Sequence, residues 1–152
     1  EMQAGAVFVP RLNEMFTAAL GAGATRDGQP ISVSTQTDLS QALVGTGFGY
    51  RSETRRQQAV FLTDLITQVR DIRRLGSAAV DLCMVACGRL DAYYERHLNS
   101  WDAAAGELIA REAGAITSDF AGAVARPEEM LAAAPGVHNA LQTAIRSIGL
   151  VD

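Results

Sequence analysis

The sequence of 152 residues contains no lysine, so arginine supplies all 13 of its basic residues. This absence excludes a catalytic lysine that forms a Schiff base and the lysine of a P-loop. Seventeen acidic residues give the chain a formal net charge of −4. Because proteins that bind nucleic acids usually present a broad basic surface, we expect no nucleic-acid partner.

Cysteine and long apolar runs are also scarce. The only cysteines are Cys83 and Cys87, whose number leaves a disulfide open but is too small for a metal site of cysteines alone. Free cysteine is usually a small core residue, so we expect two buried thiols in a cytoplasmic protein. The longest apolar runs fall far short of the roughly 20 residues of a membrane helix, and we expect no membrane partner.

What the sequence does contain is enough apolar material for a core, at 48% of residues with 20% charged. Near the N-terminus, apolar residues 6–9 and 15–18 flank a polar connection that begins with Pro10, which predicts an antiparallel hairpin. Asp27-Gly28 is a strong turn signal, and the alternation at residues 31–34 predicts a short, half-exposed strand.

The rest of the chain alternates between patterns of strands and helices, which predicts an α/β fold. Ser52 is a candidate N-cap for a helix that buries Leu62, Leu65, Ile66 and Val69. The other expected elements are strands at residues 42–44, 90–95, 115–118 and 130–134, and helices at 78–87, 101–113 and from 135 onward. In the second helix, Asp81 is the one residue that is not apolar.

Three patterns could carry chemistry but fit simpler interpretations. The glycines at residues 45–49 are spaced GxGxG, unlike a dinucleotide-binding loop, and favour a tight turn between a strand and a helix. His97 and His138 belong to no metal-binding motif, and no serine lies in a GxSxG elbow. Ser77 follows Gly76 at a helix start, where it can cap the helix, act chemically, or do both.

Glu95 and Asp102 are the strongest candidates for a site. Glu95 ends a predicted strand, and Asp102 lies in the first turn of the next helix, so both can face the rim where α/β sheets bind ligands. The helix dipole keeps such a carboxylate ionised, and ionised carboxylates suit Mg²⁺. The alternative is that Asp102 only caps its helix and Glu95 is only a surface charge.

Several segments, in order along the chain, resemble the inositol monophosphatase family. Residues 101–114 (WDAAAGELIAREAG) resemble its WDxAAGxxxxxEAG signature, and residues 91–95 (DAYYE) resemble a strand of the family. Residues 73–79 (RRLGSAA) resemble its RxxGSAA segment, and residues 21–34 resemble its GxGAxxNGxPIxVS stretch. The tryptophan-aspartate signature is specific, so the resemblance raises Asp102 above a simple capping residue.

The resemblance implies the C-terminal part of a layered α/β/α/β/α sandwich of the sugar-phosphatase type, and a Mg²⁺-dependent phosphomonoesterase acting on inositol monophosphate. By position, Asp102 would bind one Mg²⁺ and the substrate, while Gly76, Ser77 and Ala78 would line the substrate pocket. Glu95 would accept hydrogen bonds from substrate hydroxyls, and Trp101 would pack the helix. The partner would be a small phosphorylated polyol or sugar, and the resemblance also implies a homodimer.

The chain departs from the family in one respect: its other metal ligands come from GEE-type and DPxDGT motifs, and neither occurs here. We therefore expect residues 1–152 to be the C-terminal portion of a longer enzyme, inactive without the N-terminal metal-binding portion. Two alternatives stay open. The substrate could be histidinol phosphate, fructose 1,6-bisphosphate or adenosine bisphosphate, or the chain could be a non-catalytic fragment or binding module.

Overall fold

The computed structural model describes residues 2–149, which begin with a small antiparallel sheet. Its strands pair in chain order: β1 (Ala4–Val9), β2 (Glu14–Ala19), β3 (Ala24–Arg26) and β4 (Gln29–Pro30). The predicted hairpin is confirmed, with Val9 opposite Glu14 at its closed end. The turn between β3 and β4 is the Asp27-Gly28 pair, and both residues have positive φ, at 51° and 76°.

The strand predicted at residues 31–34 is wrong. The sheet ends at Pro30. Ile31 still donates its backbone N–H to the carbonyl of Ala24 in β3, but residues 31–34 belong to no strand. Val33 instead donates its backbone N–H to the carbonyl of Ala113, at the end of a distant helix. The alternation of apolar and polar residues is present, but the chain has already left the sheet and crosses to the other part of the fold.

A second, five-stranded sheet forms the centre of the molecule, in the order β6-β5-β7-β9-β8. Its strands are β5 (Leu43–Thr46), β6 (Asp71–Arg73), β7 (Ala92–Arg96), β8 (Ile116–Ser118) and β9 (Glu129–Ala133). The strands β6, β5 and β7 are parallel, and β9 and β8 run antiparallel to their neighbours. We did not predict β6, because its three residues place one apolar side chain between two charged ones.

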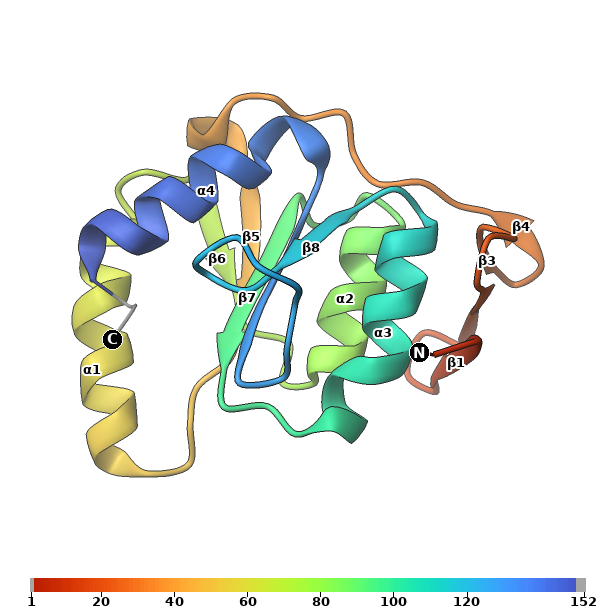
Figure 1. Ribbon diagram of the computed structural model, residues 1–152, viewed down its shortest axis with the longest axis horizontal. Coiled ribbons are helices and arrows are strands. Elements are labelled where there is room, and N and C mark those ends of the chain that lie inside the picture. The colour runs from red at the N-terminus through yellow and green to blue at the C-terminus, as the bar shows by residue number, and fades with distance from the viewer. Residues whose placement is uncertain (1, 150–152) are drawn as a thin grey trace.

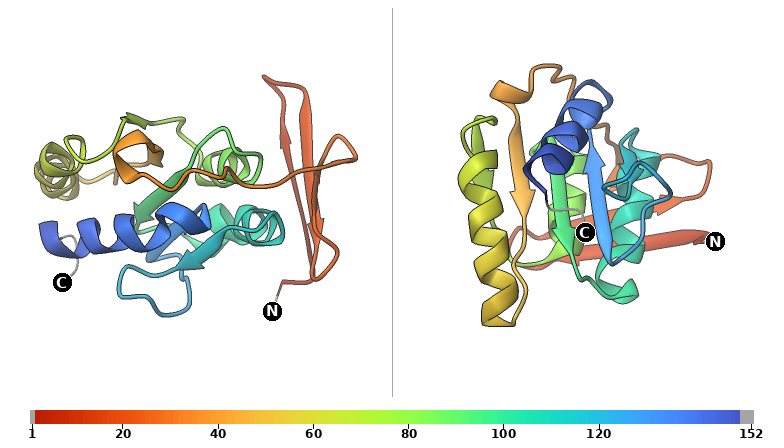
Figure 2. Two further views of the ribbon diagram at one scale, coloured as in Figure 1. Left: turned by 90° about the horizontal axis from the view of Figure 1, so that it is seen from above. Right: turned by 60° about the vertical axis from the view of Figure 1, so that its left-hand side comes forward.

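The elements stack in layers, as Figure 2 shows from above: the small sheet, then two helices, then the five-stranded sheet, then two more helices. The inner pair is α2 (Ala78–Ala86) and α3 (Ser100–Glu112), and the outer pair is α1 (Ser52–Leu65) and α4 (Pro135–Ile148). A short 3-10 helix, η1 (Leu39–Gln41), precedes β5 (Figure 1). Among residues 2–149, the search for a helix of membrane-spanning length and hydropathy finds none.

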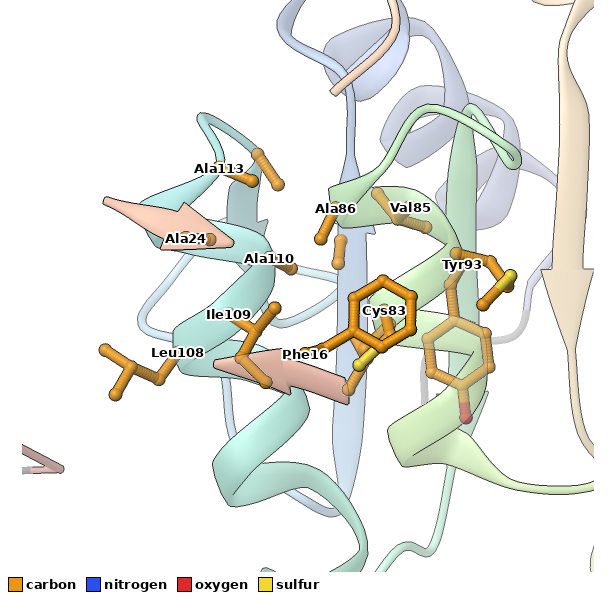
Figure 3. Packing of buried hydrophobic residues seen from close by; sticks show 14 of the residues in the cluster. Phe16, Ala24, Cys83, Val85, Ala86, Tyr93, Leu108, Ile109, Ala110 and Ala113 are labelled. Atoms are coloured by element: carbon orange, nitrogen blue, oxygen red, sulfur yellow. The ribbon is translucent and has the colours of Figure 1, made fainter. Parts of the chain in front are cut away.

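Buried apolar residues form one cluster on each face of the five-stranded sheet. The first joins α2 and α3 to the small sheet, with Phe16 of β2 packed among Cys83, Ile109 and Ala110 (Figure 3). A Cβ atom at Gly106 would lie 2.9 Å from the Cβ of Leu82, so this glycine allows α2 and α3 to pack closely. The second cluster lies between the sheet and the outer helices.

The start and the buried face of α1 differ from the prediction. Arg51 occupies the N-cap position and Ser52 is the first helical residue, without a side-chain capping bond. The helix buries Phe61 and Leu65 and then ends, so Ile66 is 47% exposed beyond its last turn. The apolar periodicity continued past the point where the backbone leaves the helix.

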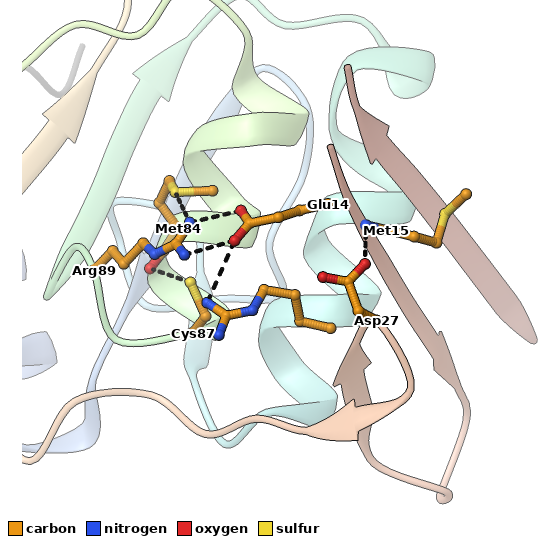
Figure 4. A network of polar contacts seen from close by, with 7 residues as sticks. Glu14, Met15, Asp27, Met84, Cys87 and Arg89 are labelled. Atoms are coloured by element: carbon orange, nitrogen blue, oxygen red, sulfur yellow. Dashed lines mark hydrogen bonds and ion pairs between the residues drawn. The ribbon is translucent and has the colours of Figure 1, made fainter. Parts of the chain in front are cut away.

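A polar contact ties the small sheet to the end of α2 (Figure 4). Both terminal nitrogens of Arg89 donate to the carboxylate of Glu14, each at 2.7 Å, and Arg26 lies 3.7 Å from the same carboxylate. The Arg89 guanidinium lowers the pKa of Glu14, so the pair is ionised at neutral pH. Both cysteines are free thiols, Cys83 fully buried and Cys87 partly buried.

Candidate active site

One cavity of about 570 Å³ lies where β5 and β7 end and where α2 and α3 begin. Because β5 and β7 are parallel, their carboxyl ends meet at the same edge of the sheet, at the lower side of Figure 1. All five residues that the sequence assigned to a site line this cavity: Gly76, Ser77, Ala78, Glu95 and Asp102. Segments separated by up to 26 positions are thus brought together.

The first wall is the N-terminus of α2. Gly76 has φ of +98°, a conformation that suits glycine, and a Cβ there would lie 2.6 Å from Nη1 of Arg74. Ser77 occupies the N-cap position as predicted, but its hydroxyl makes no capping bond. The exposed hydroxyl and the free amides of the first turn therefore remain available to an anion in the cavity.

The second wall is the N-terminus of α3, where Asn99 and Asp102 form a capping box. Oδ2 of Asp102 accepts the backbone N–H of Asn99 at 2.9 Å and its side-chain amide at 3.2 Å. Within residues 2–149, Oδ1 of Asp102 accepts no hydrogen bond, so one oxygen caps the helix while the other is available to a ligand. The ring of Trp101 is 78% exposed at the cavity, and the expectation that it packs the helix is wrong.

Glu95 forms the floor of the cavity together with Gly47, the residue that follows β5. Its Oε2 accepts a short hydrogen bond from the hydroxyl of the buried Tyr93. A Cβ at Gly47 would lie 2.0 Å from the same oxygen, so only glycine leaves room for this carboxylate. Burial raises the pKa of Glu95, and the hydrogen bond from Tyr93 opposes that rise.

Sequence reasoning missed four residues in or beside this site. The glycines at residues 45–49 were interpreted as a turn, whereas Gly45 and Gly47 make room for carboxyl side chains. Arg74 places a positive charge on the cavity wall. Asp81 is fully buried behind the first turn of α2 and also lines the cavity. The available signal was that Asp81 is the single charged residue of an otherwise apolar helix.

The two histidines are not brought together. His97 lies exposed at the cavity edge with φ of +66°, whereas His138 is buried in α4 and bonds Ser118 at 2.9 Å. No group of three or more histidine, cysteine, aspartate or glutamate side chains in residues 2–149 is arranged to hold a metal ion. Asp102 therefore belongs to no such group among these residues.

The comparisons with known proteins agree with this fold. The model of the inositol monophosphatase family matches residues 1–149, and the chain belongs to that family. It is 47% identical over 150 residues to inositol-1-monophosphatase SuhB of Mycobacterium tuberculosis (strain ATCC 25618 / H37Rv), covering 94% of this chain and 51% of that protein. It is 44% identical over 152 residues to Nus factor SuhB of Xylella fastidiosa, covering 94% and 55%.

Solved structures show the same likeness. The inositol monophosphatase of Anabaena (Nostoc) sp. PCC 7120 superposes with a TM-score of 0.91 at 37% identity, over 95% of this chain and 59% of that one. SuhB of Mycobacterium tuberculosis superposes with a TM-score of 0.89 at 44% identity, over 99% and 61%. The expected family and fold class are confirmed. The chain spans about half the length of the curated relatives it matches.

Proposed function

We propose that this chain is the C-terminal portion of a Mg²⁺-dependent phosphomonoesterase that hydrolyses inositol monophosphate to inositol and phosphate. The observation that carries the proposal is the convergence of Gly76, Ser77, Ala78, Glu95 and Asp102 on one cavity. Family membership supports the reaction class, because the family consists of phosphatases, which are hydrolases that generally use metal ions.

Each part of the cavity suits one part of such a substrate. The first turn of α2 offers backbone N–H groups and the Ser77 hydroxyl to a phosphate. Glu95, when ionised, accepts hydrogen bonds from polyol hydroxyls. The oxygen of Asp102 that caps nothing is one ligand for a divalent cation. Bound Mg²⁺ ions would activate water and neutralise charge on the phosphate, the chemistry that metal ions supply in phosphatases.

Asp102 needs further ligands, and we propose that they come from residues N-terminal to this chain. The outer face of the small sheet supports this, because it exposes apolar side chains that a folded protein normally covers. Phe8 is 50% exposed and Met15 40%, and they lie directly opposite each other on β1 and β2. In residues 2–149, β1 has a strand neighbour on one side only, so its other edge is open to further strands.

An assay of the intact gene product that carries this chain tests the proposal. We expect phosphate release from inositol 1-phosphate that requires Mg²⁺ and is abolished by a chelator. Residues 1–152 alone should show no activity, because one aspartate cannot hold the metal ions. Turnover without a divalent cation, or full activity of residues 1–152, would contradict the proposal.

The alternatives make different predictions in the same assay. Equal or better turnover of histidinol phosphate, fructose 1,6-bisphosphate or adenosine bisphosphate would overturn inositol monophosphate as the substrate. Absence of hydrolysis of all four would favour a non-catalytic fragment or binding module. Several relatives carry the name Nus factor and not that of an enzyme, which is why the assay must also test a non-catalytic role.

We also propose a cytoplasmic homodimer without a nucleic-acid or membrane partner. The two free thiols fit a reducing compartment, and the net charge of −4 does not favour nucleic acid. Light scattering of the intact gene product should give twice the mass of the monomer. A monomeric mass, or salt-dependent binding to RNA, would contradict the respective part of this proposal.

A further inference from the structure

The carboxyl groups of Glu95 and Asp81 both lie against glycines at the end of β5. A Cβ at Gly47 would meet the carboxylate of Glu95, and a Cβ at Gly45 would lie 3.0 Å from Oδ1 of Asp81. Gly45 lies in β5 and Gly47 directly follows its last residue, so the two glycines mark the same end of the strand. Asp81, from α2, and Glu95, from β7, thus both reach this end of β5, and both line the cavity.

Asp81 has no structural partner that explains its burial. It is 1% exposed, and within residues 2–149 its Oδ1 accepts no hydrogen bond. Burying an ionised carboxylate without partners is costly, so such a residue is normally replaced by an apolar one unless it has a role. Ser77, Ala78 and Asp81 share the first turn of α2, and all three line the cavity.

The charged and titratable groups around Asp81 come from each neighbouring element. Glu95 and the hydroxyl of Tyr93 lie on β7, and Arg74 lies in the segment before α2. On α3, Asp102 acts on Tyr93 and Glu95. The far end of α2 holds the pair of Arg89 with Glu14 and the two thiols, Cys83 and Cys87. Glu95 and Arg74 are therefore the charges that act on Asp81 itself.

We propose that Asp81 is a positioning residue of the substrate pocket. Its carboxyl lies against Gly45 as that of Glu95 lies against Gly47, and its charge controls how strongly Glu95 accepts hydrogen bonds from substrate hydroxyls. When Asp81 is neutral, Glu95 can carry the single negative charge of this carboxyl pair. When Asp81 ionises, the two like charges repel, and a phosphorylated substrate meets a second anion. This inference rests on the proposed function for its substrate.

Supporting the geometry, burial raises the pKa of Asp81 to about 7, with a further rise from Glu95 that Arg74 opposes. The summed charge of Asp81 and Glu95 therefore changes close to neutral pH. The coupling is reciprocal, because the charge of each carboxyl changes the pKa of the other.

The first test needs no enzymatic activity. In the intact gene product labelled with ¹³C at aspartate carboxyls, one resonance should titrate near neutral pH and disappear in Asp81→Asn. In Glu95→Gln the same resonance should titrate at lower pH, because the neighbouring negative charge is gone. This comparison remains valid if Asp81→Asn fails to fold. Titration of every aspartate near pH 4, or no response to Glu95→Gln, would overturn the proposal.

The second test measures KM for inositol 1-phosphate from pH 6 to 9 at saturating Mg²⁺. Relative to Asp81→Asn, the KM of the unmodified protein should rise about three- to tenfold across this range as the second charge forms, while kcat changes less. The matched control is Asp64→Asn on the exposed face of α1, which should follow the unmodified protein. Parallel KM profiles, or equal loss of kcat at every pH, would contradict the proposal.

The two tests separate this inference from the proposed function. Without hydrolysis of any phosphomonoester, the proposed function fails, and the carboxyl titrations still decide whether Asp81 and Glu95 are coupled. With hydrolysis but independent titrations, the function stands and the role of Asp81 is refuted.

Discussion

The two sheets of this molecule differ in how completely they are covered. The five-stranded sheet has α2 and α3 on one face and α1 and α4 on the other, and the candidate site lies at its edge (Figure 2). The small sheet packs one face on α2 and α3 and leaves its outer face bare in residues 2–149. This difference is the basis of our proposal that residues outside this chain cover the small sheet and complete the site.

The largest expected effect is on the free energy of unfolding, and it is measured by replacing two phenylalanines of the small sheet. Phe16→Ala should lower the free energy of unfolding by about 3–5 kcal/mol, because Phe16 is fully buried against α2 and α3. Phe8→Ala on the outer face should cost under about 1 kcal/mol in residues 1–152. Chemical denaturation of both variants measures these values.

Repeating the Phe8 measurement in the intact gene product sharpens the comparison. If further residues cover the outer face, the cost of Phe8→Ala should rise toward that of Phe16→Ala, because the ring would then be buried. An unchanged small cost would show that this face stays exposed, and would contradict the proposed N-terminal portion.

Asp102→Asn tests the candidate site at the edge of the five-stranded sheet. Asparagine can keep the capping bond to Asn99 but loses the charge that suits Mg²⁺, so we expect kcat/KM of the intact gene product to fall about 100-fold, or about 2.7 kcal/mol. The midpoint of thermal unfolding should change little. Asp64→Asn is the control, and unchanged turnover at low Mg²⁺ would refute the metal-ligand assignment.

Gly47→Ala should have a smaller effect on the same assay, because a methyl group at this position collides with the carboxylate of Glu95. We expect roughly a tenfold loss of kcat/KM, about 1.4 kcal/mol. In a background of Glu95→Ala the same substitution should cost little, since the colliding group is absent. Equal losses in both backgrounds would show that Gly47 acts only on the backbone.

The last prediction concerns how stability depends on pH. Asp81 has a raised pKa of about 7, so between about pH 4 and pH 7 the folded protein binds a proton that the unfolded chain releases. Stability from this group therefore falls as pH rises. Relative to the unmodified protein, Asp81→Asn should gain about 1–3 kcal/mol from pH 4.5 to pH 8. Denaturation at both pH values checks the sign, and a gain toward acid pH would contradict it.

Local patterns predicted most elements correctly, and their failures have physical reasons. The hairpin, α2, α3 and the last helix follow from periodicity and turn residues, which act over a few positions. The strand expected at residues 31–34 and the buried Ile66 followed the same patterns but lacked the tertiary partner that would complete them. Strand β6 has too few residues to produce a pattern.

The sequence by itself determined the family through residues 73–79, 91–95 and 101–114, and with it the five candidate site residues. Only the tertiary structure decided that Gly45 and Gly47 make room for the carboxyl groups of Asp81 and Glu95. The reason is distance along the chain: β5 ends at Thr46, whereas α2 begins at Ala78 and β7 at Ala92, and no local pattern records which side chain will occupy the space above a glycine.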